Sequence, residues 1–154
     1  MPSATYQSRI SPLDSSSIRL PGSEIADIRF ADGTLQVRFS RAFIIKTMTG
    51  SAEKTLWWQA GELILEGAEL LAPLPEATAR SGSEPAFICD GGDIDENVYT
   101  YRDMIPIPLE SRGLCRCDLA LRDSDQRIRA QGETIHLAME ETPHYIEHIR
   151  PDDN

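Results

Sequence analysis

The sequence predicts a mostly β protein, either an antiparallel β-barrel or a two-sheet β-sandwich, with at most one or two short helices. Apolar and polar residues alternate with a period of two over several short segments. Polar turn residues such as Asp32-Gly33 and Asp123-Ser124 separate those segments. No long stretch has the three-to-four-residue spacing of an amphipathic helix. Short strands of this kind form barrels or sandwiches, and the sequence does not distinguish the two.

The expected organisation is one domain with short ends. Residues 1–17 are rich in serine and proline and should form an irregular N-terminal arm, although Ile18 and Leu20 have the spacing of an edge strand. Residues 18–150 should form a single antiparallel β domain, and residues 151–154 a charged tail. A chain of this length buries roughly 70% of its unfolded surface, which is enough for one core.

The first half of the chain predicts a hairpin and a long strand. Residues 25–39 alternate on both sides of Asp32-Gly33, a strong two-residue turn signal. Residues 42–45 lose the alternation, which predicts a bend or burial on both faces. Residues 55–72 are rich in Glu and Leu, as helices are. A strand is preferred because Gly61 and Gly67 would each weaken a helix by about 1 kcal/mol.

The middle of the chain predicts short strands and an edge. Residues 76–85 should be a loop, 86–89 a short strand, and 90–93 a glycine-containing turn before the strand at 98–103. Residues 104–109 contain two prolines around Ile107. Because proline removes a backbone donor, this segment should be an edge or a crossing segment.

The clearest prediction is a long antiparallel hairpin within residues 113–139. A strand over 114–122 is followed by a polar turn and a return strand over 127–139. In the return strand the apolar residues occupy even positions before Gly132 and odd positions after it. This switch predicts a β-bulge at Gly132. Residues 144–149 should form one more short element.

Charge and cysteine content restrict the partners. The chain has 25 acidic and 15 basic residues and a net charge of −10, so nucleic acids and anionic membranes should be repelled. The three cysteines cannot all pair within one chain, which favours reduced thiols. The first ten residues lack a basic or apolar leader, and no apolar run approaches the roughly 18 residues of a membrane span. A cytoplasmic location is therefore expected.

Aromatic residues give the main ligand-binding candidates. Adjacent side chains on a strand point to opposite faces, so one tryptophan of the Trp57-Trp58 pair should be in the core and the other outside or in a cavity. An exposed aromatic residue beside tyrosine or arginine is a suitable contact for a ligand or partner. The predicted ligand-binding residues are Trp57, Trp58, Tyr99, Tyr101 and Arg102.

The histidines give a metal-binding alternative. Residues 144–148 have the order H-x-x-E-H, which resembles the inverzincin metalloprotease motif over five residues. On a helix, His144 and His148 could share a zinc ion, with Glu147 as a base and His136 as a third ligand. The family's downstream carboxylate has little room here, and Pro143 and Pro151 restrict any helix to about two turns.

Two further sequence patterns resemble metal sites only weakly, and their residues are expected to have structural roles. Residues 93–97 offer oxygen ligands at calcium-loop spacing, but Val98 and Met104 replace the glycine and glutamate of such a loop. Cys115 and Cys117 share a strand face and could bind a soft metal with Cys89 or His136. Their alignment with leucines favours core packing.

The sequence supports three functional hypotheses. The first is a non-enzymatic domain without a cofactor that binds a small apolar or amphipathic ligand in a barrel mouth, or a protein partner through a strand edge. The second is a metal-dependent hydrolase or metal-binding protein that uses zinc at His136, His144, Glu147 and His148. The third is a structural subunit of a homo-oligomer, with its contact near Ile107. No catalytic residue set is predicted.

Overall fold

The computed structural model describes residues 15–47, 53–76, 85–140 and 142–149. The expected tail at 151–154, most of the expected arm and most of the loop at 76–85 lie outside these residues. The described residues contain strands and no helix, which confirms the mostly β prediction. The strands are β1 (Ser15–Ala31), β2 (Thr34–Thr47), β3 (Lys54–Glu66), β4 (Glu69–Leu70), β5 (Phe87–Glu96), β6 (Tyr99–Arg102), β7 (Met104–Ile107), β8 (Glu110–Leu121), β9 (Arg127–Met139) and β10 (His144–Ile149).

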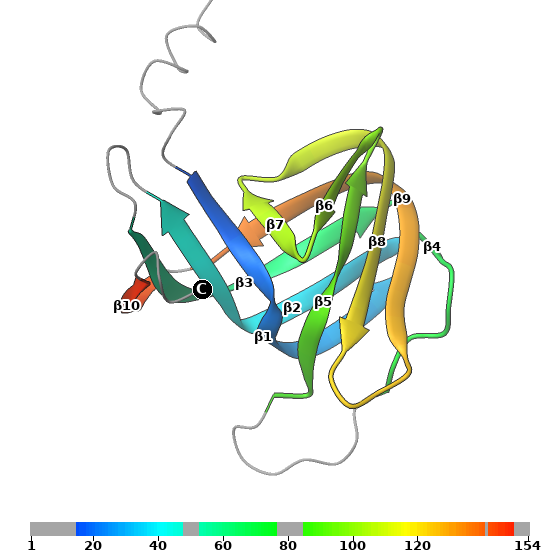
Figure 1. The fold of residues 1–154 in the computed structure, drawn as a ribbon. Helices are drawn as coiled ribbons and strands as arrows, with labels where there is room; N and C mark the ends of the chain where they lie inside the picture. Colours follow the sequence, from blue (N-terminus) through cyan, green and yellow to red (C-terminus); the bar gives the residue numbers. More distant parts are fainter. Residues whose placement is uncertain (1–14, 48–52, 77–84, 141, 150–154) are drawn as a thin grey trace, which may run out of the picture.

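Six antiparallel strands close into a barrel (Figure 1). The order around it is β1, β2, β3, β9, β8 and β5, and pairing of Glu24 and Ile25 with β5 completes the circle. The barrel is thus the observed member of the two predicted architectures. The short strands β4, β6, β7 and β10 attach to β9, β5, β1 and β3, respectively.

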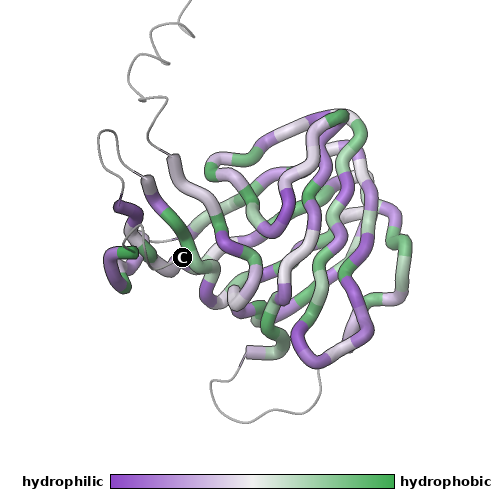
Figure 2. Tube along the Cα trace, viewed as in Figure 1, coloured by the Kyte–Doolittle hydropathy of each residue, from purple (hydrophilic) through white to green (hydrophobic). Residues whose placement is uncertain are grey.

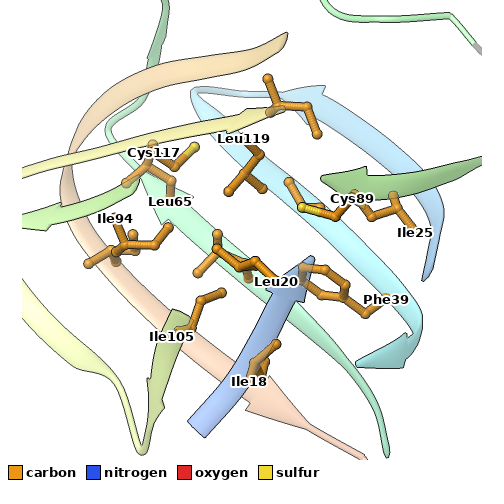
Figure 3. Close-up of a cluster of buried hydrophobic side chains, with 14 of the residues drawn as sticks. Ile18, Leu20, Ile25, Phe39, Leu65, Cys89, Ile94, Ile105, Cys117 and Leu119 are labelled. Carbon is orange, nitrogen blue, oxygen red and sulfur yellow. The ribbon is translucent and has the colours of Figure 1, made fainter. Parts of the chain in front are cut away.

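Side chains fill the barrel interior. Apolar and polar residues alternate along the long barrel strands, so that strands such as β2 and β8 bury one side (Figure 2). Phe39, Leu20 and Ile105 are fully buried in one cluster with Cys89 and Cys117 (Figure 3). The interior is therefore a packed core, as expected for a barrel of few strands.

Both predicted hairpins form. Asp32 and Gly33 join β1 to β2, and both have positive φ values, 54° and 74°. This geometry matches the twist of the two strands. The hairpin of β8 and β9 is confirmed too, but the predicted bulge at Gly132 was placed on the wrong strand. The extra residue lies on β8, where Arg112 to Cys115 face only Gly132 to Thr134.

Three further details differ from the sequence prediction. Residues 90–93 form no turn: β5 continues through them with a bulge, and the turn lies at Asn97-Val98. The strand β1 already begins at Ser15, and Ile18 pairs with β2 on one side and β7 on the other. Residues 111–113 belong to β8. By contrast, β7 pairs only with β1 among the described strands, as expected for an edge.

Strands β1, β2 and β3 continue beyond the barrel. Irregular pairing marks where they leave it, between Arg19 and Glu24 on β1 and between Phe39 and Ala42 on β2. Ser23 stabilises the first irregularity, because its hydroxyl donates to Arg19 O at 2.6 Å and accepts from Phe43 N at 3.0 Å. We call the projecting sheet the extension: it comprises residues 15–19, 41–47 and 54–59 with β10.

Candidate functional site

The extension has two faces, and the tryptophan pair on β3 is divided between them. Its inner face continues the barrel core, and Trp57 packs there against buried residues. Trp58 is the next residue along the strand, so it points to the outer face. The two tryptophans thus lie on opposite faces, as predicted, but both are partly buried, and Trp57 packs against the core without being one of its fully buried residues.

Trp57 organises the inner face. Its Nε1 donates to Thr55 Oγ1 at 2.8 Å. Tyr145 contacts it edge to face, with ring centroids 5.3 Å apart, and Lys46 Nζ lies 4.3 Å from the centre of its ring. Tyr145 also meets His148, with centroids 5.7 Å apart.

Trp58 organises the outer face. His144 stacks on it with centroids 4.1 Å apart and an angle of 15° between the rings. The Arg41 guanidinium lies 4.7 Å from the centre of the Trp58 ring. Arg19 lies over Phe43 in a similar way, at 5.9 Å. Cations over aromatic rings are held by the ring quadrupole and still leave donors for a ligand.

A groove of about 540 Å³ crosses the outer face beside these residues. The register of the sheet places its lining residues side by side: Ile45 on β2 pairs with Leu56 on β3, and Leu56 pairs with Glu147 on β10. The groove therefore combines aliphatic side chains with charges of both signs. It is lined by Arg19, Ile45, Lys54, Leu56, Glu147, His148 and Ile149.

The extension is a cationic region of an acidic protein. It carries both lysines of the chain and two arginines, against the carboxylate of Glu147 and that of Glu53 just before β3. Glu53 lies 3.5 Å from His148 Nδ1. Glu24, at the boundary with the barrel, lies opposite Arg41 in the ladder without forming an ion pair. In the described part of the chain no carboxylate forms an ion pair with the four extension cations, which are Arg19, Arg41, Lys46 and Lys54.

The other predicted ligand-binding residues lie elsewhere, on β6. Tyr99 and Tyr101 contact each other edge to face at 4.8 Å, and Arg102 donates from Nε to Asp93 Oδ1 at 3.3 Å. Tyr101 also packs against the core, and burial raises the pKa of its hydroxyl. The five predicted residues thus form two groups on different strands and do not converge on a barrel mouth.

The three candidate zinc ligands are separated. His144 and His148 lie on a strand, where four residues span about 13 Å. His136 pairs with Ile64 on β3 and His144 pairs with Trp58 on the same strand, so about 20 Å of strand separates them. In the described part of the chain no three histidine, cysteine or acidic residues are placed to hold a metal.

The cysteines are core residues. Cys89, Cys115 and Cys117 are free and fully buried, which confirms the core packing predicted for Cys115 and Cys117. Burial raises the pKa of Cys89 to about 11 and that of Cys117 to about 12. At neutral pH these thiols stay protonated, which makes them weak nucleophiles.

Sequence reasoning missed the cations of the extension. Arg19, Arg41 and Lys46 come from two different strands, and only the sheet register brings Arg19 to Phe43 of β2 and the other two to the tryptophans of β3. One signal was present: both lysines of a chain with net charge −10 lie within nine residues of each other, close to Trp57-Trp58.

The fold and this surface define an all-β protein, a closed six-stranded antiparallel barrel with a projecting aromatic and cationic sheet. Comparison with protein-family models, curated proteins and solved structures found no match to the chain. Among the described residues no helix has the length and apolar character needed to cross a bilayer.

Proposed function

We propose that this protein is a non-enzymatic binding domain for an acidic protein partner, which docks on the outer face of the extension. One observation carries the proposal: Arg19, Arg41 and Lys54 gather around aromatic and aliphatic side chains and form no ion pair with a carboxylate of the described residues, in a chain of net charge −10. Elsewhere in the described structure, arginines such as Arg38 and Arg127 form ion pairs with carboxylates.

The residue types on this face are those of protein interfaces. Arginine and tryptophan are enriched in the residues that contribute most to binding, because they bury large areas and donate several hydrogen bonds. Carboxylates of a partner would neutralise cations that otherwise repel one another. The apolar contacts with Ile45 and Leu56 would then add affinity that does not depend on salt.

A protein partner is favoured over a small ligand. The barrel interior is filled by its own side chains, so a small molecule would bind at the surface, for example in the groove on the outer face. That groove has a volume within the usual range for ligand sites, roughly 300 to 1,000 Å³. However, Arg41 and Trp58 extend the cationic and aromatic surface beyond the groove lining. A partner that covers both is larger than a single small amphiphile.

The test uses a soluble peptide in which glutamate alternates with valine, and a second peptide with lysine in place of glutamate. Binding is measured by calorimetry and by the fluorescence of Trp57 and Trp58, the only tryptophans in the chain. We expect the acidic peptide to bind, more weakly as salt rises, and the basic peptide not to bind. Equal binding of both peptides would refute the proposed charge preference.

Two variants test whether the acidic peptide binds at the groove of the extension. Lys54→Glu should weaken binding of the acidic peptide about fivefold to tenfold, because it reverses one charge beside the groove. Arg29→Glu makes the same charge change on an exposed barrel residue and should leave binding unchanged. Equal losses in both variants would mean a response to net charge alone. Binding of decanoate without binding of the peptide would assign the groove to a small amphiphile and overturn the proposal.

A further inference from the structure

Among the described strands, β10 has a partner on one side only. It pairs with β3 on one side, and it ends the order of strands in the described sheet. Five of its six residues are exposed, including Tyr145 at 50% and Ile146 at 39%. An edge of this kind presents backbone N–H and C=O groups without strand partners, which is a template for a further strand.

The edge is only weakly guarded against pairing. Natural edge strands are protected by lysine, proline, charged residues or bulges. β10 has one bulge, because Tyr145 pairs with Trp57 and Glu147 pairs with the neighbouring Leu56. It has no lysine, and Glu147 is its only acidic residue. The exposed apolar side chains instead favour contact with another chain.

The edge is also held in place. His144 stacks on Trp58, and Tyr145 packs against Trp57, so the aromatic pair fixes the first half of β10 on both faces. Glu140, just before β10, donates from its N–H to Ala60 O at 2.8 Å, and its carbonyl accepts from Gln59 Nε2 at 3.0 Å. A preorganised edge lowers the entropy cost of adding a strand.

We propose that the acidic partner docks by strand addition: an extended segment pairs with the free edge of β10. This inference rests on the proposed function and specifies the conformation of the bound segment. Side chains of an added strand alternate between the two faces. On the outer face they pass Glu147 of β10 and reach toward Lys54 on the neighbouring strand β3, with the arginines of β2 and β1 beyond it. On the inner face they lie beside Tyr145.

The expected segment therefore alternates acidic and apolar residues, with the acidic side chains on the outer face. A second copy of this chain is a poorer occupant. Pairing two β10 edges would bring two cationic extensions together and add the repulsion between two molecules of net charge −10. Charge complementarity selects the acidic segment instead.

The test combines amide hydrogen exchange, followed by NMR, with a backbone-modified peptide. When the glutamate–valine peptide binds, the β10 amides that point away from β3 should gain protection at every second position, apart from the bulge. An analogue that is N-methylated throughout keeps its side chains but cannot donate backbone hydrogen bonds. We expect it to bind at least about tenfold more weakly.

The outcomes separate the two proposals. Tight binding by the methylated analogue, or unchanged exchange in β10, would overturn strand addition and leave the acidic docking surface intact. Failure of the unmodified glutamate–valine peptide to bind would overturn both proposals. Protection of β10 that rises with protein concentration in the absence of peptide would show that a second copy occupies the edge, and this too would overturn the inference.

Discussion

Arg38 and Glu140 form a two-pronged ion pair that joins β2 to the connection between β9 and β10. The two terminal nitrogens of Arg38 donate to the two carboxylate oxygens of Glu140, with 2.9 Å between Nη2 and Oε1. The pair spans 102 residues of sequence. Together with the backbone bonds of Glu140, it fixes the point at which the chain leaves the barrel for β10.

This ion pair predicts a pH-dependent contribution to stability. The hydrogen bond from Arg38 lowers the pKa of the Glu140 carboxyl. Its folded pKa is below its unfolded value, so the stabilisation is present above the unfolded pKa and is lost as the pH falls through the folded pKa. Urea unfolding should show Glu140→Gln to be less stable than the wild type at neutral pH and equal to it in strong acid. A deficit that persists in strong acid would contradict this assignment.

The stacking of His144 on Trp58 predicts a local effect on β10. Replacing His144 with alanine removes an aromatic contact of the kind worth about 0.5 to 1.5 kcal/mol. Hydrogen exchange of the β10 amides bonded to β3 should therefore accelerate, while the barrel amides keep their rates. The control is His136→Ala, a histidine on the barrel strand β9. If His136→Ala accelerated hydrogen exchange of the β10 amides to the same extent, the contact of His144 with Trp58 would not be what stabilises the strand.

The bulge in β5 predicts that position 92 requires glycine. Gly92 has a φ of +149°, and a Cβ there would lie 2.3 Å from Asp118 O, a backbone atom that cannot move away easily. Gly92→Ala should therefore lower the free energy of unfolding by about 2 to 3 kcal/mol. Gly33 also has a positive φ but open space around it, so Gly33→Ala should cost only about 1 kcal/mol. Chemical denaturation of both variants provides the comparison, and similar losses would contradict the clash.

Because the three cysteine thiols are buried, we predict that they react slowly with thiol reagents in the folded protein. A raised pKa reduces the thiolate fraction, and the pKa values of Cys89 and Cys117 are about 11 and about 12. Native protein should consume little of a thiol-reactive disulfide reagent near pH 8, whereas protein unfolded in guanidinium should show three reactive thiols. Rapid modification of the folded protein would show that the barrel opens at these positions.

Local pattern predicted most of the strands. Alternation and turn residues located the hairpins at Asp32-Gly33 and in β8–β9, because both signals lie within a few residues of sequence. The bulges were less predictable. Gly91-Gly92 looks the same in sequence whether it forms a turn or a bulge, and the pairing of β5 with β8 decides between them.

The site could be predicted only in part. The aromatic pair on β3 was found because neighbouring residues on a strand must face opposite ways. Its cationic neighbours were not, since Arg41 reaches Trp58 only through the pairing of β2 with β3. The histidine spacing suggested a helix, yet residues 144–149 form a strand because the open edge of β3 pairs with them.

The placement of both lysines on the extension has a practical consequence. Lys46 and Lys54 are the only lysine side chains in the chain. Reagents that couple proteins to sensor chips through amines would attach at these two residues or at the α-amino group. Coupling through either lysine would turn the extension toward the chip and hide it from solution. A peptide assayed on such a chip would encounter mainly the barrel, so affinity measurements require attachment by another chemistry.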